Sequence, residues 1–164
     1  MLIRDFLQAN SARFEVLLHA PSHSATHRAG NVHVPGRSVA KSVLVRAGEV
    51  WVLAVLPATH RIETMRLAEV LGVDQIRLAT EAEVEQAFAD CEPGALPPFG
   101  RLYGMTTILD ASLSAGAEVV FVGNTRHECI RMKFKDYERM EEPMKARFAS
   151  PINARRPKNQ RKAG

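Results

Sequence analysis

Several signals that mark common protein classes are missing from this chain of 164 residues. Its two cysteines, Cys91 and Cys129, lack C-x-x-C spacing, which favours reduced thiols over a disulfide framework or a cysteine zinc site. A nucleophilic thiol would need a histidine partner, which spacing alone does not supply. No apolar run approaches the roughly 18 residues of a membrane span, and the first residues lack the features of a signal peptide. We therefore expect a cytoplasmic protein without membrane contact.

Motifs of nucleotide and serine-hydrolase sites are also missing. The sequence contains no Walker A motif, no G-x-G-x-x-G and no G-x-S-x-G, which argues against sites of those types. His23 and His27 are four residues apart and could share a helix face, but they lack the glutamate of H-E-x-x-H and a clear third ligand. A metal hydrolase is thus a minor alternative, and we expect neither a metal nor a cofactor.

Charge is distributed unevenly along the chain. There are 22 basic and 18 acidic residues, which give a formal net charge of +4. Residues 153–164 contain no acid and hold five of the basic residues, namely Arg155, Arg156, Lys158, Arg161 and Lys162. Without these five, 17 basic residues stand against 18 acidic ones, so the body is nearly neutral. We expect a solvated, disordered tail that can attract a polyanion such as tRNA, although charge alone identifies no partner.

The apolar pattern predicts interspersed strands and helices over residues 1–152, which we expect to form one domain. Expected helices cover 3–10, 63–71, 80–89 and 134–140, and the last of them is expected to close the fold. Expected strands cover 14–19, 39–46, 50–56, 76–79, 106–109, 118–122 and 128–132. Because several links are short enough for hairpins, the predicted class is α/β (α+β), with a mixed, mostly antiparallel sheet and helices packed around it.

Two local signals support this interpretation. Gly48 lies in the short link between the strands 39–46 and 50–56, which is typical of a hairpin. The second of these strands is apolar on both faces, so we expect it in the centre of the sheet. Thr80 is followed by Glu83 three residues later, which is the spacing of a capping box at a helix start.

Lys41 is the first candidate for chemistry. It lies in an apolar strand, and with a period of two it shares a face with Val39, Val43 and Val45. A lysine on a buried face must find an anion or bear the cost of desolvation. The alternative is a strand-edge lysine whose stem packs while its amine reaches water.

The second candidate is the loop 92–100, which holds three prolines and two glycines. Gly94 can adopt backbone conformations closed to other residues, and a rigid loop with amide groups can stabilise an oxyanion. A purely structural turn is the alternative. Asp110 ends a strand and is expected either to cap a helical turn or to face a cleft.

Taken in order, six segments give a pattern: V-A-K-S-V-L-V (39–45), V-W-V-L-A-V-L-P (50–57), I-R-L-A (76–79), G-A-L-P-P-F-G (94–100), T-I-L-D (107–110) and V-V-F-V-G-N (119–124). This order resembles the YbaK family, also called the prolyl-tRNA synthetase-associated or editing-insertion domain. The resemblance covers residues 14–140 and leaves out the tail. It implies a mixed-sheet α/β fold and hydrolysis of aminoacyl-tRNA esters, without a cofactor.

The resemblance also implies roles for individual residues. Lys41 matches a strand lysine that lines the family's pocket, and Ser42 stands where the family has threonine. Gly94 and Pro98 match a G-x-x-x-P loop beside the aminoacyl group, and Ala95 and Leu96 lie within that loop.

Three further positions complete the implied site. Pro97 stands where some relatives carry serine, which removes a hydroxyl and an amide. Asp110 and Gly123 fit positions where the family has an aspartate and a glycine near the pocket. We expect Lys41 and Gly94 to be catalytic and the other residues of these positions to bind substrate.

The implied reaction needs carbonyl polarisation and a positioned water. Lys41, with an ordinary pKa of about 10.4, is expected to bind phosphates or the carbonyl and not to act as a base. The expected partners are the acceptor end of a misacylated tRNA, with small amino acids on proline tRNA as candidates, and an aminoacyl-tRNA synthetase. The alternative function is a non-catalytic module of the same fold that binds an aminoacyl group or a tRNA end.

Overall fold

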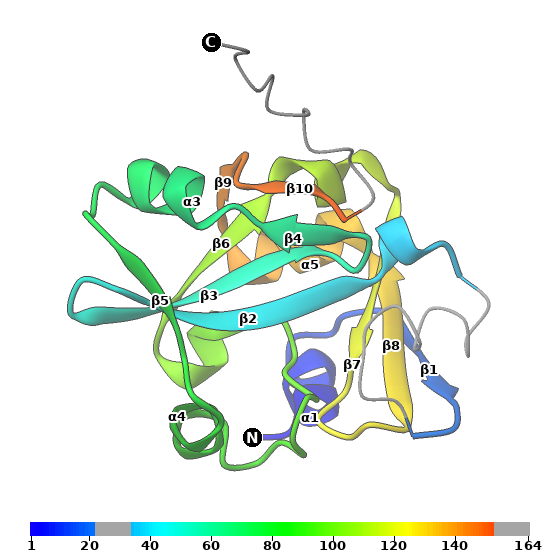
Figure 1. The fold of residues 1–164 in the computed structure, drawn as a ribbon. Helices are drawn as coiled ribbons and strands as arrows, with labels where there is room; N and C mark the ends of the chain where they lie inside the picture. The colour runs from blue at the N-terminus through cyan, green and yellow to red at the C-terminus, as the bar shows by residue number, and fades with distance from the viewer. Residues whose placement is uncertain (22–33, 153–164) are drawn as a thin grey trace, which may run out of the picture.

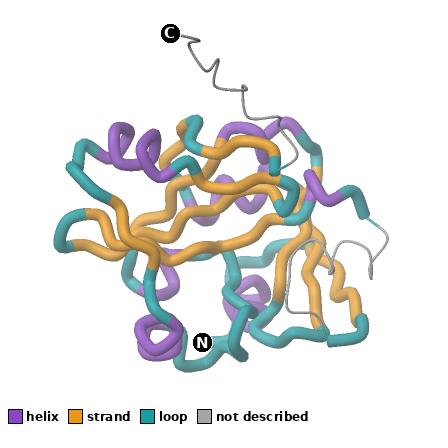
Figure 2. Tube along the Cα trace, in the orientation of Figure 1, coloured by secondary structure: helices purple, strands orange, loops and turns teal. Residues whose placement is uncertain are grey.

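The computed structural model describes residues 1–21 and 34–152 and shows two main β-sheets with helices packed on them (Figures 1 and 2). Within these residues the α-helices are α1 (Ile3–Ala9), α3 (Thr64–Leu71), α4 (Glu81–Ala87) and α5 (Phe134–Glu141). The strands are β1 (Phe14–Leu18), β2 (Ala40–Ala47), β3 (Val50–Pro57), β4 (His60–Ile62), β5 (Ile76–Leu78), β6 (Thr106–Asp110), β7 (Glu118–Val122), β8 (Glu128–Lys133), β9 (Met144–Ala146) and β10 (Ala149–Pro151). The predicted α/β class with mixed sheets is confirmed.

The larger sheet has five strands in the order β5-β2-β3-β6-β9. The predicted hairpin is present, since β2 and β3 pair antiparallel from Ala40–Pro57 to Ala47–Val50. β3 then pairs in parallel with β6, which makes it the central strand. Its residues from Val52 to Pro57 are all buried, as its two apolar faces predicted.

The second sheet has three antiparallel strands in the order β1-β8-β7. Its apolar side chains meet one face of the five-stranded sheet in the main core, where Leu53, Leu109, Phe121, Ile130 and Tyr137 are fully buried. α1 and α5 contribute to the same core. A smaller core on the other face of the five-stranded sheet packs under α3 through residues such as Leu67.

Helix termini follow the sequence signals. Thr80 and Glu83 form the predicted capping box at the start of α4, with the Glu83 amide donating to Thr80 Oγ1 at 3.2 Å. Gly72 ends α3 in the left-handed conformation, with φ of 68°, which glycine adopts without steric cost. The capping box starts α4 directly after β5, which is an edge strand of the larger sheet.

The end of the domain differs from the prediction. The helix α5 does not close the fold, because β9 and β10 follow it. β9 extends the large sheet beside β6, and β10 pairs with β4 in a separate two-stranded sheet. None of the three strands β4, β9 and β10 was expected, because their sequences, H-R-I, M-K-A and A-S-P, do not form an apolar or β-branched run. The described residues therefore form three sheets instead of the one that was expected.

Candidate functional site

The described residues enclose a cleft of about 510 Å³ beside the large sheet. Its walls are one edge of β2, the end of β5, the outer face of α4 and the loop that carries Gly94. The lining residues are Ser42, Val43, Leu44, Leu78, Ala79, Glu81, Val84, Glu85, Pro93, Gly94 and Leu96. The cleft thus brings together Ser42, Gly94 and Leu96, three of the residues that the sequence proposed as a site.

The cleft exists because β5 covers only part of its neighbour. β5 pairs with β2 from Val45 to Ala47, and the last contact beyond that is the Ala79 amide donating to the Leu44 carbonyl at 3.0 Å. Since backbone groups of alternate residues point to the same edge of a strand, Ser42 directs its N–H and C=O to the same side as Leu44. The open edge of β2 at Ser42 therefore forms one wall of the cleft.

The Ser42 hydroxyl is a polar atom in an otherwise mostly apolar wall. Its Oγ is buried and has no hydrogen-bond partner among the residues that the structure describes. A buried hydroxyl without a partner costs on the order of 1–3 kcal/mol of stability. Because Ser42 lines the cleft, a rotation about its χ1 angle would present this hydroxyl to a polar group of a ligand.

The loop that carries Gly94 is fixed at both ends by buried hydrogen bonds. The Glu92 amide donates to the Asn124 carbonyl at 2.9 Å, and Tyr137 of α5 donates its hydroxyl to the Pro98 carbonyl at 2.8 Å. Gly94 has φ of 77°, in the left-handed region. The loop is thus a rigid bend with an exposed glycine at the cleft.

The rest of the loop divides between the cleft and the core. Leu96 is half-buried and lines the cleft, whereas Ala95, Pro97 and Pro98 are buried and are not among the lining residues. The Ala95 amide is engaged with the Glu92 carbonyl at 3.0 Å. These three residues shape the bend and are not placed to contact a ligand in the cleft.

Lys41 lies beside the cleft without lining it. It is opposite Leu56 in the β2–β3 ladder, whereas Ser42 is opposite Val55, so the two side chains leave β2 on opposite faces. Lys41 is half-buried, and burial lowers the pKa of its amine. Within the described part of the chain it has no ion-pair partner. An anionic ligand would therefore stabilise its charge.

Asp110 caps a turn and holds the end of the domain, the first of the two roles that the sequence left open. It is 2% exposed, and its carboxylate accepts from the Phe148 and Ala149 amides, both at 2.9 Å. It also accepts from the Ser112 amide at 3.1 Å at the start of the short 3-10 helix Ala111–Ala115. With its carboxylate used in this way, Asp110 does not line the cleft.

Gly123 also lies away from the cleft. It directly follows β7, and its amide donates to the Glu128 carbonyl at 3.0 Å. A Cβ at this position would come within 2.8 Å of Glu128 Oε1. The glycine therefore permits close packing at the β7–β8 turn and is not among the residues that line the cleft.

Two carboxylates on the cleft were not foreseen. Glu81 and Glu85 are exposed residues of α4 and both line the cleft. They are four positions apart and so lie on one face of the helix. The capping box predicted the helix, but no pattern in the sequence indicated which face of the helix borders a cavity.

Cys91 and Cys129 form no disulfide, and each contacts different polar side chains. Burial raises the pKa of Cys91 to about 11, which keeps its thiol protonated at neutral pH. Cys129 does have a histidine neighbour, His19 Nε2 at 3.2 Å, which sequence spacing could not reveal. However, Cys129 is 0% exposed, so its sulfur is closed to a macromolecular substrate.

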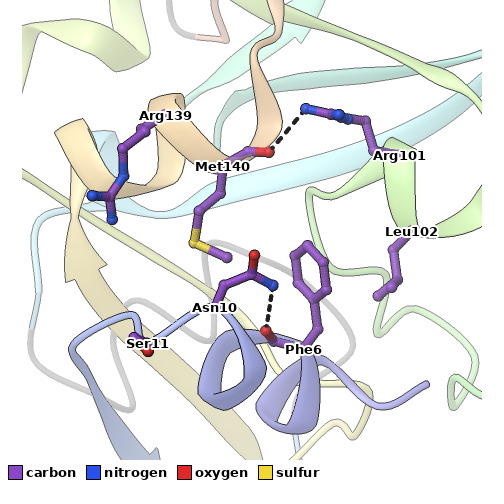
Figure 3. Close-up of a pocket in the computed structure, with 7 residues that line it drawn as sticks. All are labelled: Phe6, Asn10, Ser11, Arg101, Leu102, Arg139 and Met140. Carbon is purple, nitrogen blue, oxygen red and sulfur yellow. Dashed lines mark hydrogen bonds between the residues drawn. The ribbon is translucent and has the colours of Figure 1, made fainter.

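A second groove lies on another side of the molecule, where α1, α5 and the 3-10 helix Gly100–Tyr103 meet (Figure 3). Phe6, Leu102 and Met140 give it an apolar floor, with Arg101 and Arg139 at its rim. Both arginines are already paired, Arg101 with Glu142 at 3.5 Å and Arg139 with Asp136 at 3.6 Å. This groove holds none of the residues that the sequence proposed.

Several predictions lie outside the described residues. His23 and His27 belong to residues 22–33, and the basic residues of the tail belong to 153–164, so the metal alternative and the tail contacts stay predictions. Among the residues that are described, no cluster of three or more histidine, cysteine or carboxylate side chains is placed to hold a metal ion. None of the described helices combines the length and apolarity needed to cross a lipid bilayer.

The sequence and the fold were compared with those of known proteins. Residues 19–140 match the family model of the aminoacyl-tRNA editing domain. Two solved structures share the architecture. One, of a hypothetical protein, has a TM-score of 0.82, 17% identity, and coverage of 90% of this chain and 99% of the other. The second, proposed to be a trans-editing enzyme for prolyl-tRNA synthetase, has a TM-score of 0.80, 19% identity, and coverage of 90% and 94%.

Similar sequences occur within longer curated proteins. The proline–tRNA ligase of Thiobacillus denitrificans is 39% identical over 67 residues, which are 41% of this chain and 12% of the ligase. That of Ralstonia pickettii is 25% identical over 126 residues, covering 64% of this chain and 22% of the ligase. The chain thus spans less than a quarter of the length of these relatives.

Proposed function

Because the chain belongs to the aminoacyl-tRNA editing domain family, we propose that it hydrolyses the ester bond of misacylated tRNA as a separate, trans-acting deacylase. Small amino acids attached to proline tRNA are the proposed substrates. The similarity to a region of proline–tRNA ligases supports this choice of tRNA. Action in the cytoplasm and contact with a synthetase belong to the same proposal.

The observation that carries the proposal is the cleft where the Ser42 hydroxyl and the Gly94 bend meet. The cleft is lined by apolar side chains such as Leu44 and Leu96, which suits a small aliphatic group. A synthetase gains only about 1–3 kcal/mol of discrimination from one methylene. A second pocket that accepts small side chains would remove the errors that this limit allows.

The Ser42 amide is the proposed oxyanion donor, and the Gly94 bend forms the other wall of the cleft. Gly94 has a conformation that brings main chain to the cleft without a side chain, and Ser42 directs its amide to the open edge of β2. One such donor typically contributes about 2.7–4 kcal/mol to transition-state stabilisation. The Ala95 amide is excluded from this role because it is bound to the Glu92 carbonyl.

Lys41 is proposed to hold the terminal phosphates and not the ester carbonyl, since its side chain leaves β2 on the face opposite Ser42 and does not line the cleft. Its half-buried, unpaired amine adjoins Ser42 on β2, and an anion would offset the desolvation that lowers its pKa. The proposed reaction needs no metal and no cofactor, because a polarised carbonyl and a positioned water suffice for an activated ester. We assign the base to the substrate itself, through its ribose hydroxyl or its amino group.

A deacylation panel tests this function. Several tRNAs, each carrying a wrong amino acid, are incubated with protein far below substrate concentration, and the surviving aminoacyl-tRNA is measured over time. We expect many turnovers for small amino acids on proline tRNA and loss of activity in Lys41→Ala, with unchanged folding by circular dichroism. An Arg139→Ala variant, changed on a different side of the molecule, is the matched control and should keep full activity.

The same panel separates the enzyme from a non-catalytic binding module. A binding module would protect the ester or leave its rate of hydrolysis unchanged, with no turnover beyond one equivalent. Full activity of folded Lys41→Ala would refute the role of that lysine. Inhibition by a chelator would instead support the metal alternative built on His23 and His27.

A further inference from the structure

A stack of cationic and aromatic side chains lies on the large sheet, some distance from the cleft. The guanidinium carbon of Arg46 is 4.9 Å from the centre of the Trp51 ring, and that of Arg77 is 5.7 Å from it. The three residues come from neighbouring strands, since Arg46 is paired with Trp51 across β2 and β3 and with Arg77 across β2 and β5. We call Arg46, Trp51 and Arg77 the arginine–tryptophan stack.

The stack lies on the same face of β2 as the Ser42 side chain. Ser42, Leu44 and Arg46 alternate along β2, so their side chains leave the strand on one face. Leu44 is buried in the main core, and Trp51 packs against the same core. Four residues of strand separate Ser42 from Arg46, which corresponds to about 13 Å.

Arg46 is the cation of the stack that has no partner for its charge. Arg77 is held by Glu83 through two hydrogen bonds of 2.7 and 2.9 Å, so its charge is largely compensated. Arg46 forms no ion pair with any described residue. Both arginines border a groove of about 700 Å³, in which Asp74 is the one carboxylate among the lining residues.

This arrangement fits the backbone of an RNA strand. A guanidinium that stacks on an indole is held in place while its N–H edge stays available, and that edge matches the oxygens of a phosphate. Its plane can also stack on an unpaired base. Glu81 and Glu85 line the cleft and repel phosphates, so on the Ser42 face of β2 the unpaired guanidinium of Arg46 is the favoured position for a phosphate.

We propose that the arginine–tryptophan stack is a binding surface for the acceptor arm of the tRNA, with Arg46 in contact with a phosphate a few nucleotides from the ester in the cleft. A separation of about 13 Å is within the reach of a strand whose terminal nucleotide lies in the cleft. This rests on the proposed function, since it takes the ligand to be tRNA. The proposed surface is additional to the groups that act on the ester in the cleft.

The sole tryptophan of the chain makes the test direct. Uncharged proline tRNA is titrated into the full-length protein while Trp51 fluorescence and the anisotropy of labelled tRNA are followed at several salt concentrations. We expect the fluorescence to change on binding, and Arg46→Ala to weaken affinity about fivefold to tenfold and to reduce the slope of log K against log salt by about one. Arg46→Lys, which keeps the charge and loses the stack, should fall between wild type and Arg46→Ala.

Arg139→Ala serves as the control, because it removes one exposed arginine from the second groove. It should bind tRNA with the affinity and salt slope of wild type. Equal affinity of Arg46→Ala and wild type, or an equal loss in Arg139→Ala, would overturn the proposal. If wild type deacylates tRNA and Arg46→Ala binds tRNA as tightly as wild type, the proposed surface is wrong and the proposed function stands. If Arg46→Ala binds tRNA more weakly but wild type deacylates none of the tRNAs, the surface stands and the proposed function fails.

Discussion

Tyr137 and Pro98, which are 39 residues apart in the chain, are joined by a buried hydrogen bond of 2.8 Å from the tyrosine hydroxyl to the proline carbonyl. The ring of Tyr137 is fully buried against Phe99 at a centroid distance of 5.1 Å. Through this contact α5, which is remote from the cleft, holds the far end of the loop that carries Gly94.

We predict that Tyr137→Phe lowers the free energy of unfolding by about 1–3 kcal/mol, because it leaves the buried Pro98 carbonyl without its donor. Urea denaturation measures the loss, and the rate of deacylation should fall at the same time because the bend is less well fixed. Tyr103→Phe is the control: its hydroxyl donates to the exposed Asp90 and has longer contacts of 3.3 and 3.4 Å with Cys91 and Asn124, and because water can replace the donor to Asp90, the loss should be smaller. Equal losses in the two variants would contradict the prediction.

Glu141 should make stability depend on pH. Its side chain is 2% exposed, and burial raises the pKa of its carboxyl above the ordinary value of 4.5. The folded state therefore holds the proton more tightly than the unfolded state. The stabilisation from this group is complete below pH 4.5 and is lost as the pH rises through the folded pKa.

Urea denaturation between about pH 4 and pH 8 tests this dependence. In Glu141→Gln, which keeps an oxygen to accept from Thr107 and the Arg101 amide, the fall of stability with rising pH should become shallower. Substitution of the exposed Glu142 by glutamine leaves the buried carboxyl in place and should leave the slope as it is in wild type. A slope that stays the same in Glu141→Gln would show that another group titrates.

Gly94→Ala is predicted to impair deacylation beyond its effect on stability. The φ of 77° at Gly94 costs an alanine about 1–2 kcal/mol, and the added methyl group would enter the wall of the cleft. Gly104→Ala provides a matched control, since Gly104 has φ of 72° and its added Cβ would meet no atom within 4 Å. Both variants should lose similar stability in thermal denaturation, and only Gly94→Ala should lose activity; the same activity in both would exclude a special role for the bend.

Ser42→Ala is predicted to raise stability while it lowers activity. The Ser42 hydroxyl is buried without a partner, so its removal should raise the free energy of unfolding by about 1 kcal/mol. If the hydroxyl binds the aminoacyl group, kcat/KM on misacylated tRNA should fall, and Ser42→Thr should retain much of it. A variant that is both less stable and fully active would contradict the role given to this serine.

The parts of the fold that the sequence predicted are those set by local interactions. The hairpin around Gly48 and the capping box of Thr80 and Glu83 involve residues close in sequence, so their patterns carry the information. The strands β9 and β10 were missed because they form only through pairing with β6 and β4, which are remote in sequence. Their sequences, M-K-A and A-S-P, contain no β-branched residue, unlike the equally short β5 with Ile76.

The site was predicted in part, for similar reasons. Ser42, Gly94 and Leu96 do meet at one cleft, as their order along the chain suggested. The period of two already implied that the side chains of Lys41 and Ser42 leave β2 on opposite faces. The resemblance to the family nevertheless placed both residues at one pocket. Glu81 and Glu85 were missed because exposed acidic residues are common in the first turn of any helix. They border a cleft only because the loop that carries Gly94 lies beside α4.

The carboxylate of Asp110 has a consequence for how the protein is made. It ends β6 but takes two of its hydrogen bonds from Phe148 and Ala149, which the ribosome synthesises 38 and 39 residues later. Until that stretch has left the exit tunnel, the nascent sheet carries a buried acid that lacks these donors. The domain should therefore complete its folding only after Phe148 and Ala149 have emerged, and a chain that ends before Phe148 should be recognised by chaperones and proteases.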